Sequence, residues 1–196
     1  MYAFDFSMPL NLGRLKDEQV FKLNQILKSK GFENRVTTPA IVINEKKPNI
    51  RVIYNTGEFS LKAGPGVSKE DFEECVNVID QSMKSIIEES KTNVYTIRIA
   101  ETYTSEKENA IDTLKGFMGF NLNEEPFDSF FGVGFRFLKK HDNLFDEFKM
   151  EPFLRDTDTL YIEGIYNYDR NCMLSVRDAC YTSEESFSAD VNKFLI

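Results

Sequence analysis

Hydrophobic and polar residues alternate with a period of two along much of this chain. Within residues 2–8, Phe4 and Phe6 share one face of an extended segment while Asp5 and Ser7 share the other. This alternation is typical of a strand that is buried on one side only. The same pattern predicts further strands at 38–44, 50–54, 59–63, 93–102, 130–138, 144–153, 159–168 and 172–180.

Four other segments place their apolar residues at a helical period. The clearest covers 69–89, where Phe72, Val76 and Ile79 follow one another at intervals of three or four, and Ser68 with Asp71 forms a capping box at its start. We expect the other helices over 17–30, after a cap at Ser105, and from a cap near Ser183.

The predicted elements fall into two similar halves, 1–91 and 92–196. Their order is β-α-β-β-β-α and then β-α-β-β-β-β-α, and the two closing helices begin with SKEDFEECVN (68–77) and SEESFSADVN (183–192), which share five of ten residues. Internal duplication would explain the match. The alternative is that both helices obey the same capping rules independently, and the halves can equally form one continuous domain.

One-sided strands beside amphipathic helices predict an α+β two-layer sandwich, in which a mostly antiparallel sheet carries its helices on one face. The other face should then gather small, polar and charged side chains. Its predicted members are Asp5, Ser7, Glu58, Ser60, Lys62, Thr96, Arg98, Gly132, Gly134, Arg136, Tyr161 and Glu163.

This open face is the first candidate binding site. Two arginines and a carboxylate on neighbouring strands suit an anionic ligand or a protein partner. Glycines inside a strand mark a bend or the close approach of another group, so a curved sheet without a ligand is the alternative. The residues that we expect to take part are Arg98, Gly132, Gly134, Arg136, Tyr161 and Glu163.

A second candidate is the loop that leads into the clearest helix. Free backbone N–H groups at a helix N-terminus, with lysines beside them, are able to hold an anion. A plain strand-to-helix turn is the alternative, because the order of residues is not that of a P-loop. The loop residues in question are Lys62, Gly64, Gly66 and Ser68.

Composition narrows the classes of partner. The net charge of −8 opposes binding to phosphate backbones, although residues 1–66 hold 10 Lys and Arg against 6 Asp and Glu, a local excess of +4. No apolar run is long enough to cross a membrane, and the start of the chain does not have the pattern of a signal peptide. We therefore expect a cytoplasmic protein with no membrane or nucleic-acid partner.

Signatures of catalysis are absent from the sequence. The chain has one histidine, His141, and three cysteines, which we expect to be reduced and buried, and it contains no GxSxG segment. Asp156 and Asp158 suit turns better than a metal site, since the spacing of a calcium loop is missing. The sequence thus predicts no catalytic residue, no metal and no cofactor.

The segment 49–104 carries a family resemblance. The stretches that match are Phe59-Ser-Leu61, Val67-Ser-Lys-Glu-Asp-Phe72 and Tyr95-Thr-Ile-Arg98-Ile-Ala-Glu-Thr-Tyr103. They resemble part of a sporadically distributed family of bacterial proteins of unknown function. The resemblance implies an αβ architecture and transfers no active residue.

These observations favour a non-catalytic binding protein that engages a protein partner through its open sheet face or a free strand edge, as inhibitors, antitoxins and immunity proteins do. The main alternative is a protein or enzyme that binds a small anionic ligand between the two halves. A subunit of a homo-oligomer, with the open face buried against its own copy, is the third hypothesis.

Overall fold

The computed structural model describes residues 2–46, 49–86, 94–104, 110–118, 134–141, 143–153, 156–169 and 174–195. Within them, nine strands form one sheet in the order β2-β3-β4-β5-β1-β6-β9-β8-β7, and every neighbouring pair is antiparallel. The strands are β1 (Tyr2–Pro9), β2 (Glu33–Thr37), β3 (Ile41–Lys46), β4 (Ile50–Asn55), β5 (Glu58–Ala63), β6 (Val94–Thr104), β7 (Phe135–His141), β8 (Leu144–Phe153) and β9 (Asp156–Asp169). The helices are α1 (Asp17–Ser29), α2 (Lys69–Ile86), α3 (Ala110–Met118) and α4 (Val176–Leu195).

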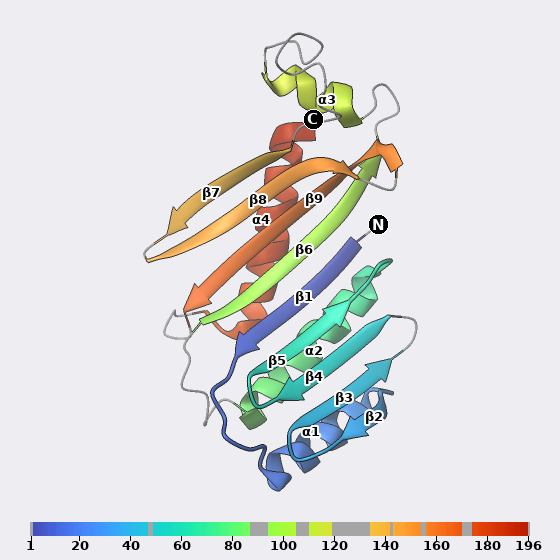
Figure 1. Cartoon of the computed structure of the whole chain (residues 1–196), viewed down its shortest axis with the longest axis vertical. Helices are drawn as coiled ribbons and strands as arrows, with labels where there is room; N and C mark the ends of the chain where they lie inside the picture. Colours follow the sequence, from blue (N-terminus) through green and yellow to red (C-terminus); the bar gives the residue numbers. More distant parts are fainter. Residues whose placement is uncertain are drawn as a thin grey trace.

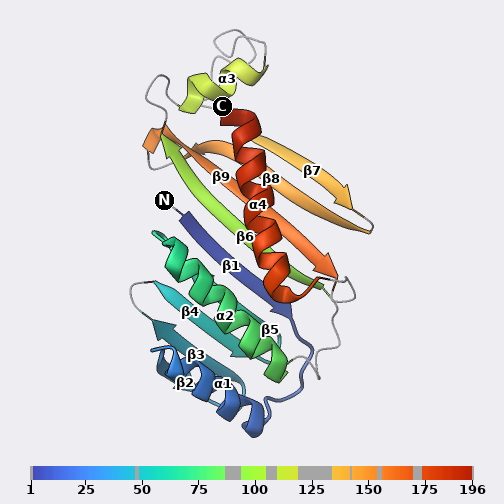
Figure 2. The ribbon, with the colours of Figure 1, turned by 180° about the vertical axis from the view of Figure 1, so that it is seen from behind.

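The helices and the sheet form two layers. Helices α1, α2 and α4 run along one face of the sheet, while α3 lies at the end of the strands, where it contacts β8 and β9 (Figures 1 and 2). In the described part of the chain, no helix covers the opposite face, which is turned toward the viewer in Figure 1. The predicted α+β two-layer arrangement is therefore confirmed.

Strand β1 lies in the middle of the sheet and joins its two halves. It pairs with β5 on one side and with β6 on the other, in a register that sets Phe4 opposite Ile99 and Asp5 opposite Arg98. Phe4 and Phe6 are fully buried beneath the helices. The two predicted halves, 1–91 and 92–196, thus contribute to one continuous sheet.

The start of α2 follows the predicted capping box. The Asp71 carboxylate accepts hydrogen bonds from the Ser68 N–H and hydroxyl groups, and the Ser68 hydroxyl accepts one from the Asp71 N–H. Phe72, Val76 and Ile79 are buried against the sheet, with the Phe72 ring edge-on to Phe4 at 4.9 Å. Each such buried side chain contributes about 1.5–3 kcal/mol to the free energy of unfolding.

The last helix begins earlier than the sequence pattern indicates. Residues 176–180 belong to α4, so the strand expected at 172–180 is wrong, and the cap is Ser175 with Asp178 rather than Ser183. Ser183 lies buried inside the helix, where its hydroxyl is 2.9 Å from the Tyr168 hydroxyl. A serine that faces the core was mistaken for a cap, because polar residues seldom occupy such positions.

The first half contains a strand that the sequence did not reveal. All five residues of β2 are exposed, and its pairing with β3 has a bulge between Asn34 and Val36, so no alternation marks it. Four consecutive strands, β2 to β5, therefore follow α1 in the first half, and three, β7 to β9, follow α3 in the second. The sequence pattern predicted three strands in the first of these runs and four in the second. The matched decapeptides also start at different points of α2 and α4, so internal duplication stays a prediction.

None of the helices in the described ranges is long and apolar enough to cross a membrane.

Gly164 allows α4 to lie directly against the sheet. A β-carbon at this position would come within 2.9 Å of the Phe187 ring and within 2.7 Å of the Tyr166 hydroxyl. Gly164→Ala should therefore lower the free energy of unfolding by about 1–3 kcal/mol, since overpacking displaces these rings. Gly116→Ala, on an open position of α3, should instead raise it by about 0.5–1 kcal/mol. Urea denaturation of both variants tests this, and equal effects would contradict the packing account.

Candidate functional site

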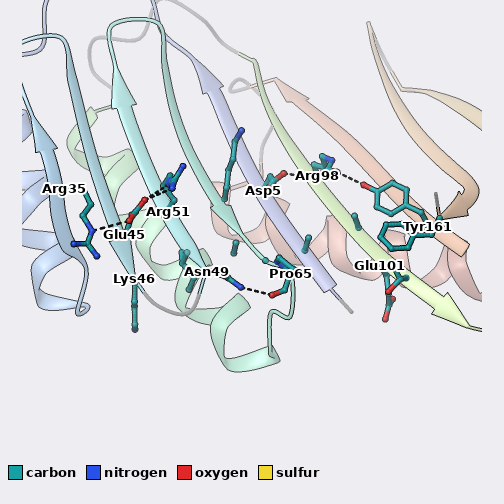
Figure 3. Close-up of a pocket in the computed structure, with 18 residues that line it drawn as sticks. Asp5, Arg35, Glu45, Lys46, Asn49, Arg51, Pro65, Arg98, Glu101 and Tyr161 are labelled. Atoms are coloured by element: carbon teal, nitrogen blue, oxygen red, sulfur yellow. Dashed lines mark hydrogen bonds and ion pairs between the residues drawn. The ribbon is translucent and has the colours of Figure 1, made fainter. Parts of the chain in front are cut away.

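A groove of about 910 Å³ crosses the open face of the sheet. The residues that line it come from eight of the nine strands, namely β1 to β6, β8 and β9. Strand β1, in the middle of the sheet, contributes Ala3 and Asp5. Figure 3 shows how these side chains stand on the strands. The groove therefore belongs to both halves of the molecule and lies on the face that the helices leave bare.

Small residues form the floor of this groove. Ala3 on β1 lies opposite Ala100 on β6, and Gly64 follows directly after β5. In the neighbouring row of the register, the longer side chains of Lys62 and Arg98 flank Asp5 and rise beside this strip. The hollow arises because the register of three strands brings small side chains together between long ones.

Arg98 organises the polar network beside the floor. It donates hydrogen bonds to Asp5 on β1 at 2.6 Å and to the Glu163 carboxylate on β9 at 3.0 and 3.3 Å. It also donates to the Tyr161 hydroxyl, which in turn donates to Glu163 at 2.6 Å. Lys149 on β8 adds an ion pair with Glu163 at 3.7 Å. One guanidinium group thus ties together three neighbouring strands and crosses the junction between the halves.

The environment of Glu163 keeps it ionised although it is 8% exposed. Burial raises the pKa of this carboxyl group, but hydrogen bonds from Arg98 and Tyr161, together with the positive charges of Arg98 and Lys149, hold the pKa below its ordinary value. Burial, followed by the hydrogen bond to Glu163, raises the pKa of Tyr161, which stays protonated. The network is therefore a fixed arrangement of charges at neutral pH.

The structure brings together only some of the residues predicted for the open face. Arg98, Tyr161 and Glu163 form the network just described, and Arg98 and Tyr161 line the groove. Arg136 lies on the same face but outside the groove, where it donates to Glu147. Gly134 also lies outside the groove, packed against Glu151, and Gly132 falls outside the described residues.

The predicted anion loop is divided between two structural roles. Lys62 and Gly64 line the groove on the open face. Ser68 belongs to the cap of α2, where its N–H group already donates to Asp71, and Gly66 has the positive φ of 89° that the turn before the cap requires. The carboxylate of Asp71 thus occupies the position that an anion would take at this helix N-terminus.

Sequence reasoning considered a ligand site between the two halves but missed the floor of the groove and several of its residues. Ala3 and Ala100 were not singled out, because an alanine among polar residues carries no chemical signal until the strand register is known. Arg35 and Arg51 were missed as well, and both pair with Glu45 on β3. Ala100 is buried although it belongs to the open face, so only the register reveals that small residues meet there.

The cysteines that the structure describes are not activated as nucleophiles. Cys75 and Cys180 are buried, and burial raises the pKa of each thiol to about 12, so neither is a thiolate at neutral pH. Cys172 and residues 119–133, which precede Gly134, fall outside the described residues. Within the described ranges, no three His, Cys, Asp or Glu side chains are placed to hold a metal ion.

Arg98 and Arg136 offer a direct comparison of a partly buried ion pair with an exposed one. Arg98→Met leaves the buried Glu163 carboxylate with weaker partners, and we expect a loss of about 2–3 kcal/mol in the free energy of unfolding. Arg136 has a side chain that is 64% exposed, so Arg136→Met should cost less than about 1 kcal/mol. Urea denaturation at pH 7 measures both losses. Equal losses would show that the Arg98 network does not stabilise the sheet.

The comparisons with protein families and with curated proteins identify no relative of this chain. No protein-family model matches the chain, and no curated protein matches it at a significant level. The resemblance of residues 49–104 to a bacterial family therefore stays a prediction.

Proposed function

We propose that this chain is a non-catalytic binding protein that receives a protein partner on the open face of its sheet. The observation that carries the proposal is the groove of about 910 Å³ on a face that no described helix covers. A hollow in the sheet face increases the area that a bound partner can contact, whereas it has no role on a face that contacts only water. An inhibitor, antitoxin or immunity role is the form of binding that we favour.

The charges around the groove bear on this proposal. Five basic residues and three acidic residues line it, although the whole chain carries a net charge of −8. The basic side chains belong to Arg35, Lys46, Arg51, Lys62 and Arg98, and the acidic ones to Asp5, Glu45 and Glu101. The groove is thus a locally cationic site on an acidic protein, which favours a partner with negative charge at the contact.

A small anionic ligand is the second candidate. Its support is the volume of the groove, which lies within the range of about 300–1,000 Å³ that ligand pockets span. A thermal-shift screen of metabolites distinguishes the two, because a metabolite that binds only the folded state must raise the melting temperature. A homo-oligomer and a cytoplasmic location stay predictions, and light scattering tests the first of them.

A matched pair of substitutions on β1 tests the proposed surface. Ala3→Tyr places a large ring on the floor of the groove, and we expect it to abolish stoichiometric capture of a partner from the source lysate. Ser7→Tyr lies on the same strand and the same face, outside the groove, and should leave capture intact. Quantitative mass spectrometry of proteins retained by each immobilised variant gives the comparison.

The proposal fails if the Ala3 and Ser7 variants retain the same proteins in the same amounts. Circular dichroism and a melting curve of each variant check that the fold is intact, so that a loss of capture reports on the surface alone.

A further inference from the structure

Lys62 stands between two charged residues that are already engaged elsewhere. In the register of the sheet, Lys62 on β5 lies opposite Arg51 on β4 and opposite Asp5 on β1. Arg51 donates to Glu45 at 2.6–2.7 Å, on the far side from Lys62. Asp5 accepts from Arg98 at 2.6 Å, again on the far side.

Among the described residues, Lys62 is the one basic side chain of the groove without an acidic partner. Lys46 pairs with Glu74 at 2.6 Å, and Arg35 pairs with Glu45 at 3.2 Å. Two like charges directly opposite each other on neighbouring strands destabilise a sheet. The Arg51–Lys62 pair is therefore an unfavourable arrangement in the free protein that an anion placed between the two side chains would relieve.

The groove is also longer than one small anion. Its lining runs from Arg35 on β2 past Tyr161 on β9 to Phe153 on β8, and β2 and β9 alone are separated by six steps in the sheet. At a spacing of about 4.8 Å between strands, the part of the groove between β2 and β9 extends over about 29 Å. An extended peptide of about nine residues has this length, whereas a metabolite would fill only part of it.

We propose that Lys62 and Arg51 form a carboxylate-binding subsite for an acidic, extended segment of the partner protein, lying across the strands. This inference rests on the proposed function and names the chemistry of the partner. The basic residues of the groove recur on β2, β4, β5 and β6, along the path of such a segment. The rings among its lining residues, Phe153 and Tyr161, lie together at one end, stacked 6.4 Å apart, which is a poor platform for successive nucleotide bases.

The test uses a fluorescently labelled peptide of nine glutamates and the full chain. We expect saturable binding by fluorescence anisotropy, with an affinity that falls as salt is added. Lys62→Met should weaken this binding about tenfold or more, because a charge-assisted contact is lost. Lys69→Met is the matched control, since Lys69 is an exposed lysine outside the groove and its loss should leave affinity unchanged.

Neither variant should melt below the wild type, because Lys62 has no ion-pair partner to lose among the described residues and its removal relieves the like-charge pair with Arg51. Equal weakening by Lys62→Met and Lys69→Met would overturn the subsite, since binding would then follow overall charge. Displacement of the peptide by citrate at the same carboxylate concentration would overturn the extended segment in favour of a small anion. Tighter binding of an oligothymidylate than of the peptide would overturn it in favour of a nucleic acid.

Failure of this inference is separate from failure of the proposed function. If the glutamate peptide does not bind, yet Ala3→Tyr selectively removes a captured partner, then the open face binds a protein whose contact is not acidic. If Ala3→Tyr also leaves capture unchanged, the binding surface itself is wrong.

Discussion

The pairing of β1 with β6 is the contact on which the rest of this molecule depends. Six register pairs, from Tyr2↔Glu101 to Ser7↔Thr96, join the N-terminal strand to the first strand of the second half. Because the sheet continues through this junction, the described helices of both halves share one side and leave the other face bare. The groove floor and the Arg98 network both lie on the same junction, so neither exists in one half alone.

The two faces of the junction are held together by different forces. On the helix side, Phe4 and Phe6 of β1 are fully buried, and the hydrophobic effect dominates. On the bare side, the Arg98 guanidinium connects Asp5 with Glu163, which replaces apolar packing by charge-assisted hydrogen bonds. A partly buried network of this kind stabilises less than a core does, but it fixes the geometry of the groove wall.

The sequence was sufficient to predict the two layers, most of the strands and the polar face, since side-chain alternation and helical periodicity record burial directly. Arg98, Tyr161 and Glu163 were placed on that face correctly, because each sits at an alternate position of a strand. The groove could not be predicted, since it depends on which strands are neighbours. Ala3 and Ala100 are 97 positions apart in the chain, and they meet only through the β1–β6 register.

Native-state hydrogen exchange tests the central claim most directly, by measuring the free energy of opening for each amide across the sheet at increasing urea. If β1 and β6 join the halves into one cooperative unit, the central amides of β5, β1, β6 and β9 will exchange with one common free energy, equal to that of global unfolding. If amides of β6 and β9 exchange at a clearly lower free energy than those of β1 and β5, the halves unfold separately. The continuous sheet would then not be the unit that supports the open face.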